Sequence, residues 1–143
     1  MEKILVDDGQ KFDFGNTSRE YAKYRDIYPE EFFERLHEIG IGTKNSHWLD
    51  IGTGTGVIPR GMAKYGANIM ATDIAENQIQ EAVNLSKGMD NIEYQVTAAE
   101  NLDFPDNSFD AITACQCFWY FDPNVIVPKI KSMLKADGIF LKV

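Results

Sequence analysis

The amino-acid sequence predicts an α/β fold with a parallel, doubly wound sheet, and three observations support this prediction. Short apolar segments alternate with longer segments in which apolar residues recur at helical spacing. Glycine, proline and asparagine residues mark most of the boundaries between these segments. A glycine-rich turn joins the first apolar segment to the helix that follows it. Because strands that alternate with helices favour right-handed crossovers, helices are expected on both faces of the sheet.

The expected elements follow one another from Pro29, a residue type that often starts a helix. Strands are expected at residues 47–51, 68–72, 92–96, 109–114 and 139–143. Helices are expected at residues 29–39, 57–65, 76–86 and 123–134, and a turn at Asp137-Gly138. On the third of these helices, the residues expected to face inward are Ile79, Ala82, Val83 and Leu85. Residues 1–28 are expected to form an arm with one short helix around Ser18–Lys23.

Length and charge restrict the class of protein. The chain has 143 residues, enough for one domain with a real core but not for two. Its net charge is -8, with 14 basic residues scattered among 22 acidic ones, which argues against nucleic acid as a main partner. No apolar stretch approaches the length of a membrane span. We therefore expect a cytoplasmic protein that acts on a small molecule and does not enter a membrane.

The cysteines and histidines predict no metal site. Cys115 and Cys117 cannot complete a zinc site, and in an extended segment they point to opposite faces, which disfavours a disulfide between them. His37 and His47 are isolated and are expected to be surface or packing residues.

The glycine-rich turn is the first candidate site, because ligands of such sheets bind beyond the carboxyl ends of the strands. Gly52, Gly54 and Gly56 let the backbone turn sharply and let a ligand approach the bare main chain. A dinucleotide-binding turn would need glycine where Val57 stands. One strand further on, Asp73 can accept hydrogen bonds from ribose hydroxyls, or it can cap the next helix.

Segments of the sequence resemble class I S-adenosylmethionine-dependent methyltransferases, and the resemblance runs from about Tyr21 to the last residues. The segment Trp48-Leu49-Asp50-Ile51-Gly52-Thr53-Gly54-Thr55-Gly56 is similar to the first motif of that family. Residues 73–78, 97–110 and 134–141 are similar to its later segments, and residues 21–29 to its N-terminal arm. The resemblance implies a Rossmann-like sheet in the strand order 3-2-1-4-5. It divides the chain into an arm at residues 1–28 that covers the cofactor and a cofactor-binding domain at residues 29–143.

The resemblance also implies S-adenosyl-L-methionine as the cofactor. Asp50 and the glycines would hold its methionine part, Asp73 its ribose, and the main-chain N–H of Ala99 its adenine. The complete set of implied cofactor-binding residues is Tyr21, Arg25, Asp50, Gly52, Thr53, Gly54, Gly56, Asp73, Ile74, Gln78, Ala99, Glu100 and Gln116. Trp119 and Tyr120 would line the substrate pocket, and Phe118 stands where family members often carry a histidine, so no catalytic base is assigned.

The implied activity is methyl transfer to an unidentified, small-molecule acceptor. Two alternatives stay open: a non-catalytic module that binds S-adenosylmethionine, and an NAD-dependent oxidoreductase. The family's sheet has seven strands, and this chain stops at the fifth, near Val143. We therefore expect the chain to be truncated, with an exposed edge strand through which two copies could associate.

Overall fold

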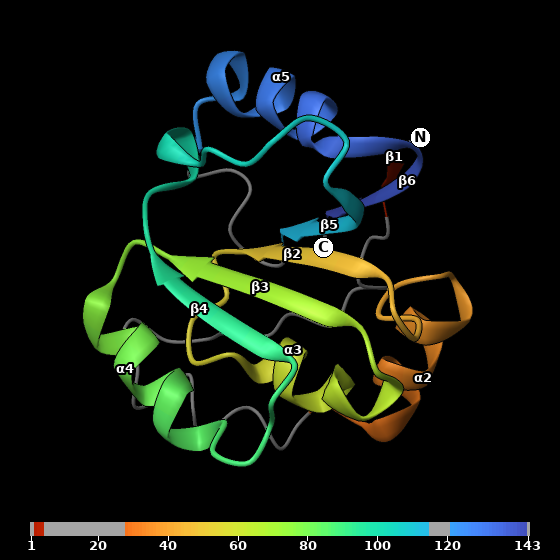
Figure 1. Ribbon diagram of the computed structural model, residues 1–143, viewed down its shortest axis with the longest axis vertical. Coiled ribbons are helices and arrows are strands. Elements are labelled where there is room, and N and C mark those ends of the chain that lie inside the picture. The colour runs from red at the N-terminus through yellow and green to blue at the C-terminus, as the bar shows by residue number, and fades with distance from the viewer. Residues whose placement is uncertain (1, 5–27, 115–120, 143) are drawn as a thin grey trace.

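The computed structural model describes residues 2–4, 28–114 and 121–142, and these form one parallel sheet flanked by helices (Figure 1). The sheet order is β1-β6-β5-β2-β3-β4, and every neighbouring pair is parallel. The strands are β1 Glu2–Ile4, β2 His47–Ile51, β3 Asn68–Asp73, β4 Ile92–Val96, β5 Phe109–Ala114 and β6 Leu134–Lys142. The last five of these confirm the predicted strand order 3-2-1-4-5.

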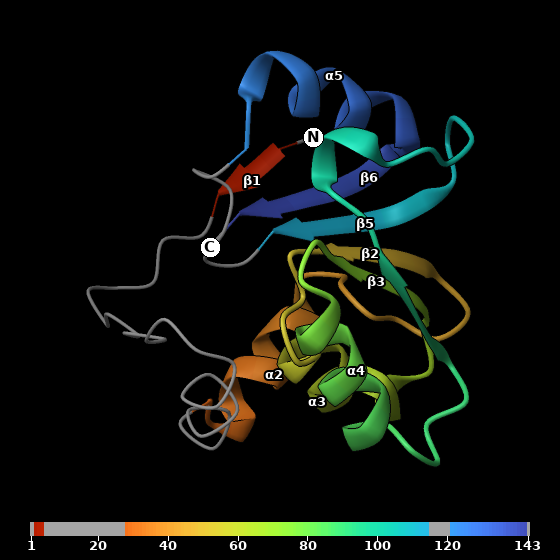
Figure 2. The same ribbon diagram turned by 90° about the vertical axis from the view of Figure 1, so that its left-hand side faces the viewer.

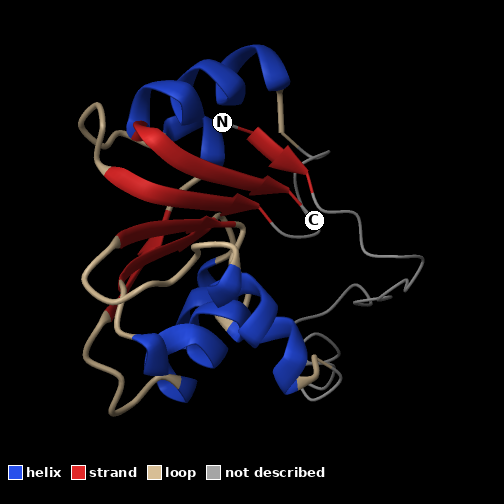
Figure 3. Ribbon diagram, turned by 90° about the vertical axis from the view of Figure 1, so that its right-hand side faces the viewer, coloured by secondary structure: helices blue, strands red, loops and turns tan. Residues whose placement is uncertain are grey.

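The helices form two layers, one on each face of the sheet. The α-helices are α2 Glu30–Glu38, α3 Val57–Met62, α4 Glu76–Leu85 and α5 Pro123–Met133, with 3-10 helices η2 Ala63–Tyr65 and η3 Ala99–Asn101. One face is covered by α2, α3 and α4, and the other by α5 and η3 (Figures 2 and 3). No helix among the described residues is both long and apolar enough to cross a membrane.

Each face of the sheet has its own hydrophobic core. On the side of α2 and α3, Trp48 and Ile69 pack with Leu36 and Met62. On the side of α5, the buried residues include Leu49, Ile51, Ile112, Ile126 and Ile130. The central strand β2 therefore buries consecutive residues on opposite faces, as expected for a parallel sheet covered on both sides.

The sequence determines where α5 starts. The carboxylate of Asp122 accepts a hydrogen bond from the N–H of Asn124 at 3.0 Å, and Pro123 occupies the first turn, where its missing N–H costs nothing. The same start fixes Phe121 beside the carboxyl ends of the strands, where it lines a cavity described below.

Three details of the predicted elements differ from the structure. Val83 is 50% exposed, so its predicted inward orientation is wrong, and the buried residue at that end of α4 is Ser86. The predicted turn at Asp137-Gly138 lies inside β6, where the pairing with β5 shifts register between Phe109 and Ala111. The short helix expected around Ser18–Lys23 lies outside the described residues.

The edge next to β6 is not fully exposed, because the N-terminal segment contains a strand that was not predicted from the sequence. β1 pairs with β6 in parallel, with Glu2 opposite Phe140 and Ile4 opposite Lys142. Residues from the two ends of the chain thus lie side by side (Figures 2 and 3). The prediction that β6, the fifth strand of the expected core, has a bare edge is therefore wrong along these three residue pairs.

Candidate functional site

The glycine turn at residues 52–56 lies at the carboxyl end of β2 and leads into α3. The N–H of Thr53 donates to the carbonyl of Thr72 on β3 at 2.8 Å, and the N–H of Gly56 donates to the carbonyl of Thr53 at 2.9 Å. Hydrogen bonds thus hold the turn together internally and attach it to the neighbouring strand β3. These two hydrogen bonds stabilise the observed conformation of the turn.

Asp50 lies beneath this turn as a buried carboxylate, 2% exposed. One oxygen accepts a hydrogen bond from the Thr53 hydroxyl at 2.7 Å, and the other accepts from the Thr113 hydroxyl. The Thr113 oxygen in turn accepts from the indole N–H of Trp48 at 2.9 Å. A buried chain of side chains therefore connects β2, β5 and the glycine turn.

The environment of Asp50 makes its carboxyl easier to protonate. Burial raises the pKa of Asp50 from 3.8 to about 6, against the hydrogen bonds from Thr113 and Thr53, and the charge of Asp73 raises it further. The pKa thus lies closer to neutral pH than that of an ordinary aspartate. Because Asp50 does not line the cavity described next, its predicted contact with a cofactor stays a prediction.

Asp73, the last residue of β3, binds both the glycine turn and the start of α4. Its Oδ2 accepts from the N–H of Gly54 and its Oδ1 from the N–H of Ala75, each at 2.9 Å. Asp73 does not cap α4, because the N-cap residue is Ala75 and no side chain makes a capping hydrogen bond to the helix; its bond to the N–H of Ala75 instead fixes the segment that leads into α4. Each carboxylate oxygen keeps a further lone pair that can accept from a ligand hydroxyl.

A cavity of about 340 Å³ opens at the carboxyl ends of the strands, next to Asp73. Its lining residues are Ile51, Gly52, Thr72, Asp73, Ile74, Thr97, Ala98, Ala99, Glu100 and Phe121. The structure thus brings together five of the predicted site residues: Gly52, Asp73, Ile74, Ala99 and Glu100. Ile74 is 72% exposed, which is unusual for an isoleucine and leaves its side chain available to pack against a ligand.

Thr72, which lines this cavity, has a buried side-chain oxygen, Oγ1, without a hydrogen-bond partner among the described residues. Oε1 of Gln78, the third residue of α4, is also buried and unpaired, but Gln78 does not line the cavity. Buried polar atoms are normally bonded, so the unpaired oxygen of Thr72 at the cavity is suited to a polar ligand.

The other predicted site residues fall into three groups. Thr53, Gly54 and Gly56 belong to the turn but do not line the cavity. Asp50 and Gln78 are described too and do not line it either. The remaining residues, which lie outside the described part of the chain, are Tyr21, Arg25, Gln116, Trp119 and Tyr120.

Glu100 is held in place by the chain itself, because its Oε2 accepts from the N–H of Asp122 at 3.1 Å. Away from the cavity, the ring of His37 stacks on Tyr65 with centroids 4.1 Å apart, which confirms a packing role. Among the described residues, no three histidine, cysteine or acidic side chains gather as a metal site would require.

Sequence reasoning missed Thr113, which completes the bonding of Asp50. The available signal was a threonine between an isoleucine and an alanine in an apolar strand, and the structure buries it fully, at 0% exposed. Such a hydroxyl must find a buried partner. Its partner could not be read from the sequence, because Asp50 and Thr113 are 63 residues apart and become neighbours only through the β2–β5 register.

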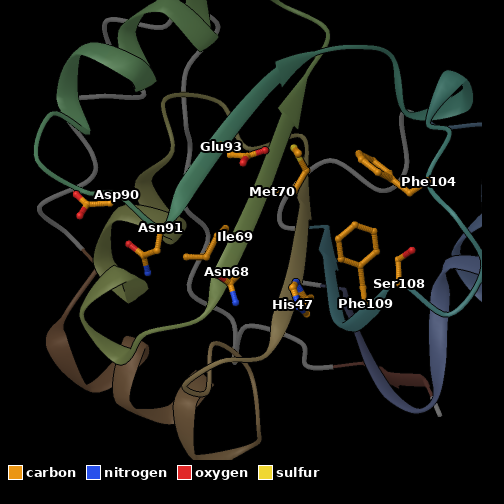
Figure 4. Close-up of a pocket in the computed structure, with 10 residues that line it drawn as sticks. All are labelled: His47, Asn68, Ile69, Met70, Asp90, Asn91, Glu93, Phe104, Ser108 and Phe109. Carbon is orange, nitrogen blue, oxygen red and sulfur yellow. The ribbon is translucent and has the colours of Figure 1, made fainter.

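A second cavity, of about 490 Å³, lies towards the opposite ends of the strands (Figure 4). His47 and Asn68, the first residues of β2 and β3, line it together with Met70, Phe104 and Phe109. It contains none of the residues predicted to bind a cofactor. The larger cavity is therefore separate from the site formed by the glycine turn and Asp73.

The fold and the smaller cavity define the class of protein. A parallel sheet in this order, with a glycine turn after β2 and a carboxylate at the end of β3 beside one cavity, is a Rossmann-like domain of the kind that binds nucleoside cofactors. Comparison with known families is more specific. The chain belongs to the methyltransferase domain family, whose sequence model matches residues 49–141.

Individual relatives agree with this family. The uncharacterized methyltransferase YcgJ of Bacillus subtilis is 31% identical over 135 residues, which cover 88% of this chain and 52% of the relative. The ubiquinone/menaquinone biosynthesis C-methyltransferase UbiE of Rickettsia bellii is 33% identical over 122 residues, covering 79% and 47%. The chain thus spans about half the length of the curated relatives it matches.

Solved structures show the same fold. The crystal structure of YcgJ superposes with a TM-score of 0.70 at 29% identity, covering 76% of this chain and 48% of that one. A SAM-dependent methyltransferase from Aquifex aeolicus gives a TM-score of 0.71 at 21% identity, covering 85% and 69%. The Rossmann-like fold predicted from the sequence is thereby confirmed.

Proposed function

We propose that the protein is a methyltransferase that takes its methyl group from S-adenosyl-L-methionine and transfers it to a small-molecule acceptor. The observation that carries the proposal is the cavity between Gly52 and Asp73. Its volume of about 340 Å³ is in the range of ligand pockets, and its lining combines bare main chain, the two carboxylates of Asp73 and Glu100, and apolar walls. The family match and the SAM-dependent Aquifex aeolicus structure point to the same cofactor.

Each part of the cofactor has a suitable partner in this cavity. Ribose hydroxyls can donate to the free lone pairs of the Asp73 carboxylate. Ile74 and Ala99 offer apolar surface to the adenine ring. Gly52, which has no side chain, leaves room for the amino-acid end.

This reaction requires the chain to position the two reactants more than to supply acid or base groups. The cofactor would supply a methyl group on a positively charged sulfur. When the acceptor's electron pair bonds to the methyl carbon, the bond from that carbon to the sulfur breaks, and the sulfur is left as a neutral thioether. Holding the two reactants in line can contribute about 7–11 kcal/mol of barrier reduction. The hydrogen bonds of the glycine turn and the two hydrogen bonds that Asp73 accepts provide such a rigid frame.

The first acceptors to test come from quinone biosynthesis. The Rickettsia bellii relative is named a ubiquinone/menaquinone biosynthesis C-methyltransferase, and a relative from Tropheryma whipplei that is 40% identical over 75 residues is named a demethylmenaquinone methyltransferase. A labelled-methyl transfer assay with quinol precursors, set against a panel of unrelated hydroxyl and amine acceptors, would identify the acceptor class.

Calorimetric titration of the full chain with adenosylhomocysteine and with NAD tests the cofactor. We expect adenosylhomocysteine to bind and NAD to give no signal. Replacing Asp73 with asparagine should weaken adenosylhomocysteine at least tenfold, because the amide is neutral and only one of its two ends accepts hydrogen bonds. Asp110→Asn, at the far end of β5, is the matched control and should bind normally. Binding of NAD alone would overturn the proposal, and cofactor binding without any methyl transfer would favour the non-catalytic alternative.

A further inference from the structure

Tyr94 on the edge strand β4 reaches the glycine turn from two strands away. Its hydroxyl occupies the space that a Cβ on Gly56 would take, and its ring atoms Cζ and Cε1 lie 3.1 and 3.2 Å from that position. The phenol therefore packs directly against the backbone of Gly56, the residue at which the turn enters α3.

The register of the sheet explains how the side chain reaches so far. Thr113, Asp50, Ala71 and Tyr94 are successive partners across β5, β2, β3 and β4, so their side chains leave the same face. Ala71, between Asp50 and Tyr94, is 0% exposed and ends at its Cβ. Its small side chain leaves the ring of Tyr94 room to extend over β3 towards the turn.

The tyrosine hydroxyl is fixed from the other side by Ser86. Tyr94 Oη and Ser86 Oγ are 2.7 Å apart, and Ser86, the residue that ends α4, is 8% exposed. Burial raises the pKa of Tyr94 above its ordinary value of 10.0, so the phenol stays neutral and available as a hydrogen-bond donor. This part-buried hydrogen bond joins the end of α4 to the tyrosine that contacts Gly56.

Gly56, which the Tyr94 phenol contacts, is hydrogen-bonded both to the turn and to α3. Its N–H is bonded to the carbonyl of Thr53, and its carbonyl accepts from the N–H of Arg60 at 2.9 Å. Arg60 also donates from Nε to the carbonyl of Thr55 at 3.1 Å. A shift of Gly56 towards α4 would therefore move Thr53 and Thr55 with it, and the phenol blocks that shift.

We propose that Tyr94 and Ser86 act together as positioning residues for the cofactor site, because they keep the glycine turn in the position that cofactor binding requires. This proposal rests on the proposed function. It assigns a role to α4 as a whole, because α4 starts beside Asp73, through Ala75, and ends at Ser86. Both ends of one helix thus hold parts of the same site.

The test is the affinity of the full chain for adenosylhomocysteine in Tyr94→Phe, Ser86→Ala and the double variant. Each single change removes the same hydrogen bond, so each should weaken binding about 3–10-fold. The double variant should bind no more weakly than the weaker single variant, because the pair acts as one unit. Affinity that equals wild type in both single variants, or losses that multiply in the double variant, would overturn the proposal.

A stability control separates positioning from general loosening of the fold. Ile92→Val lies on the same strand, two residues before Tyr94, and removes one methylene from the core beside α3. It should lower the melting temperature while leaving the affinity unchanged. If it weakens adenosylhomocysteine as much as Tyr94→Phe does, the positioning role is wrong. A wild-type chain that binds no adenosylhomocysteine would overturn the proposed function itself, and the role of Tyr94 with it.

Discussion

At the scale of single residues, Asp50 combines an unfavourable environment with well-placed partners. A carboxylate that is 2% exposed loses its hydration, and two threonine hydroxyls return only part of that loss. The raised pKa of Asp50, about 6, expresses the balance. The residue therefore helps to organise the turn at some cost to the stability of the whole domain.

Asp50→Asn should change how stability depends on pH. The pKa of Asp50 is higher in the folded state than in the unfolded chain, so the folded protein binds more protons between pH 3.8 and about 6. Wild-type stability should therefore fall as pH rises through this window and level off above it. Relative to Asp50→Asn, which cannot titrate, we expect the wild type to lose about 1 kcal/mol between pH 5 and pH 7. Urea unfolding of both proteins measures this difference, and a difference that does not change with pH would contradict it.

Gly56→Ala and Gly88→Ala form a second residue-scale test. Both glycines have positive φ, at 76° and 89°, so alanine strains the backbone at each by about 1–2 kcal/mol. A Cβ at Gly88 meets nothing within 4 Å, whereas at Gly56 it meets the Tyr94 hydroxyl. Gly56→Ala should therefore cost about 1–3 kcal/mol more in unfolding free energy. Equal losses in chemical denaturation would show that the phenol moves aside without cost.

At the scale of elements, the hydroxyl of Thr113 joins β5 to β2. Thr113→Val keeps the shape but leaves the Trp48 indole N–H without its acceptor and removes one donor from Asp50. We expect a loss of roughly 2–4 kcal/mol in unfolding free energy, since two buried hydrogen bonds disappear. Thr113→Ser keeps the hydroxyl and should cost only about 1 kcal/mol for the missing methyl. If serine and valine destabilise equally in thermal or urea unfolding, the hydroxyl is not the stabilising group.

The elements themselves were largely predictable because they depend on local patterns. Apolar runs marked β2 to β5, and proline at residue 29 and at residue 123 marked two helix starts. The inward orientation of Val83 was wrong because helical periodicity does not fix which residues at a helix end still reach the sheet. The strand β1 was missed because three residues carry too little pattern to identify a strand.

The site was predictable only in its local part. The spacing of Gly52, Gly54 and Gly56 before a helix, and Asp73 after the next strand, can be read along the chain. The contacts that Thr113 makes with Asp50 and Tyr94 makes with Gly56 cannot be read in this way, because they arise from the register of four strands. Residues that contact each other across a sheet leave no sequence pattern at any fixed spacing.

At the scale of the whole molecule, the sheet formed by the described residues has its edges at β4 and at β1. β1 shields β6 only along three residue pairs, at Phe140–Lys142. Unpaired edges invite pairing with another chain, so these few pairs affect the behaviour of the protein in solution. The predicted association of two copies through this edge should therefore depend on whether β1 is in place.

Removing residues 1–4 should expose the β6 edge and promote self-association. The shortened chain loses the strand that pairs with residues 140–142, and those N–H and C=O groups of this segment that point towards β1 rather than β5 then become available to a second copy. Sedimentation velocity over a concentration series should show the shortened chain associating at concentrations where the full chain does not. The β4 edge is the same in both chains, so any difference between them is due to β6. Identical sedimentation of the two chains, with identical melting temperatures, would mean that β1 does not protect this edge.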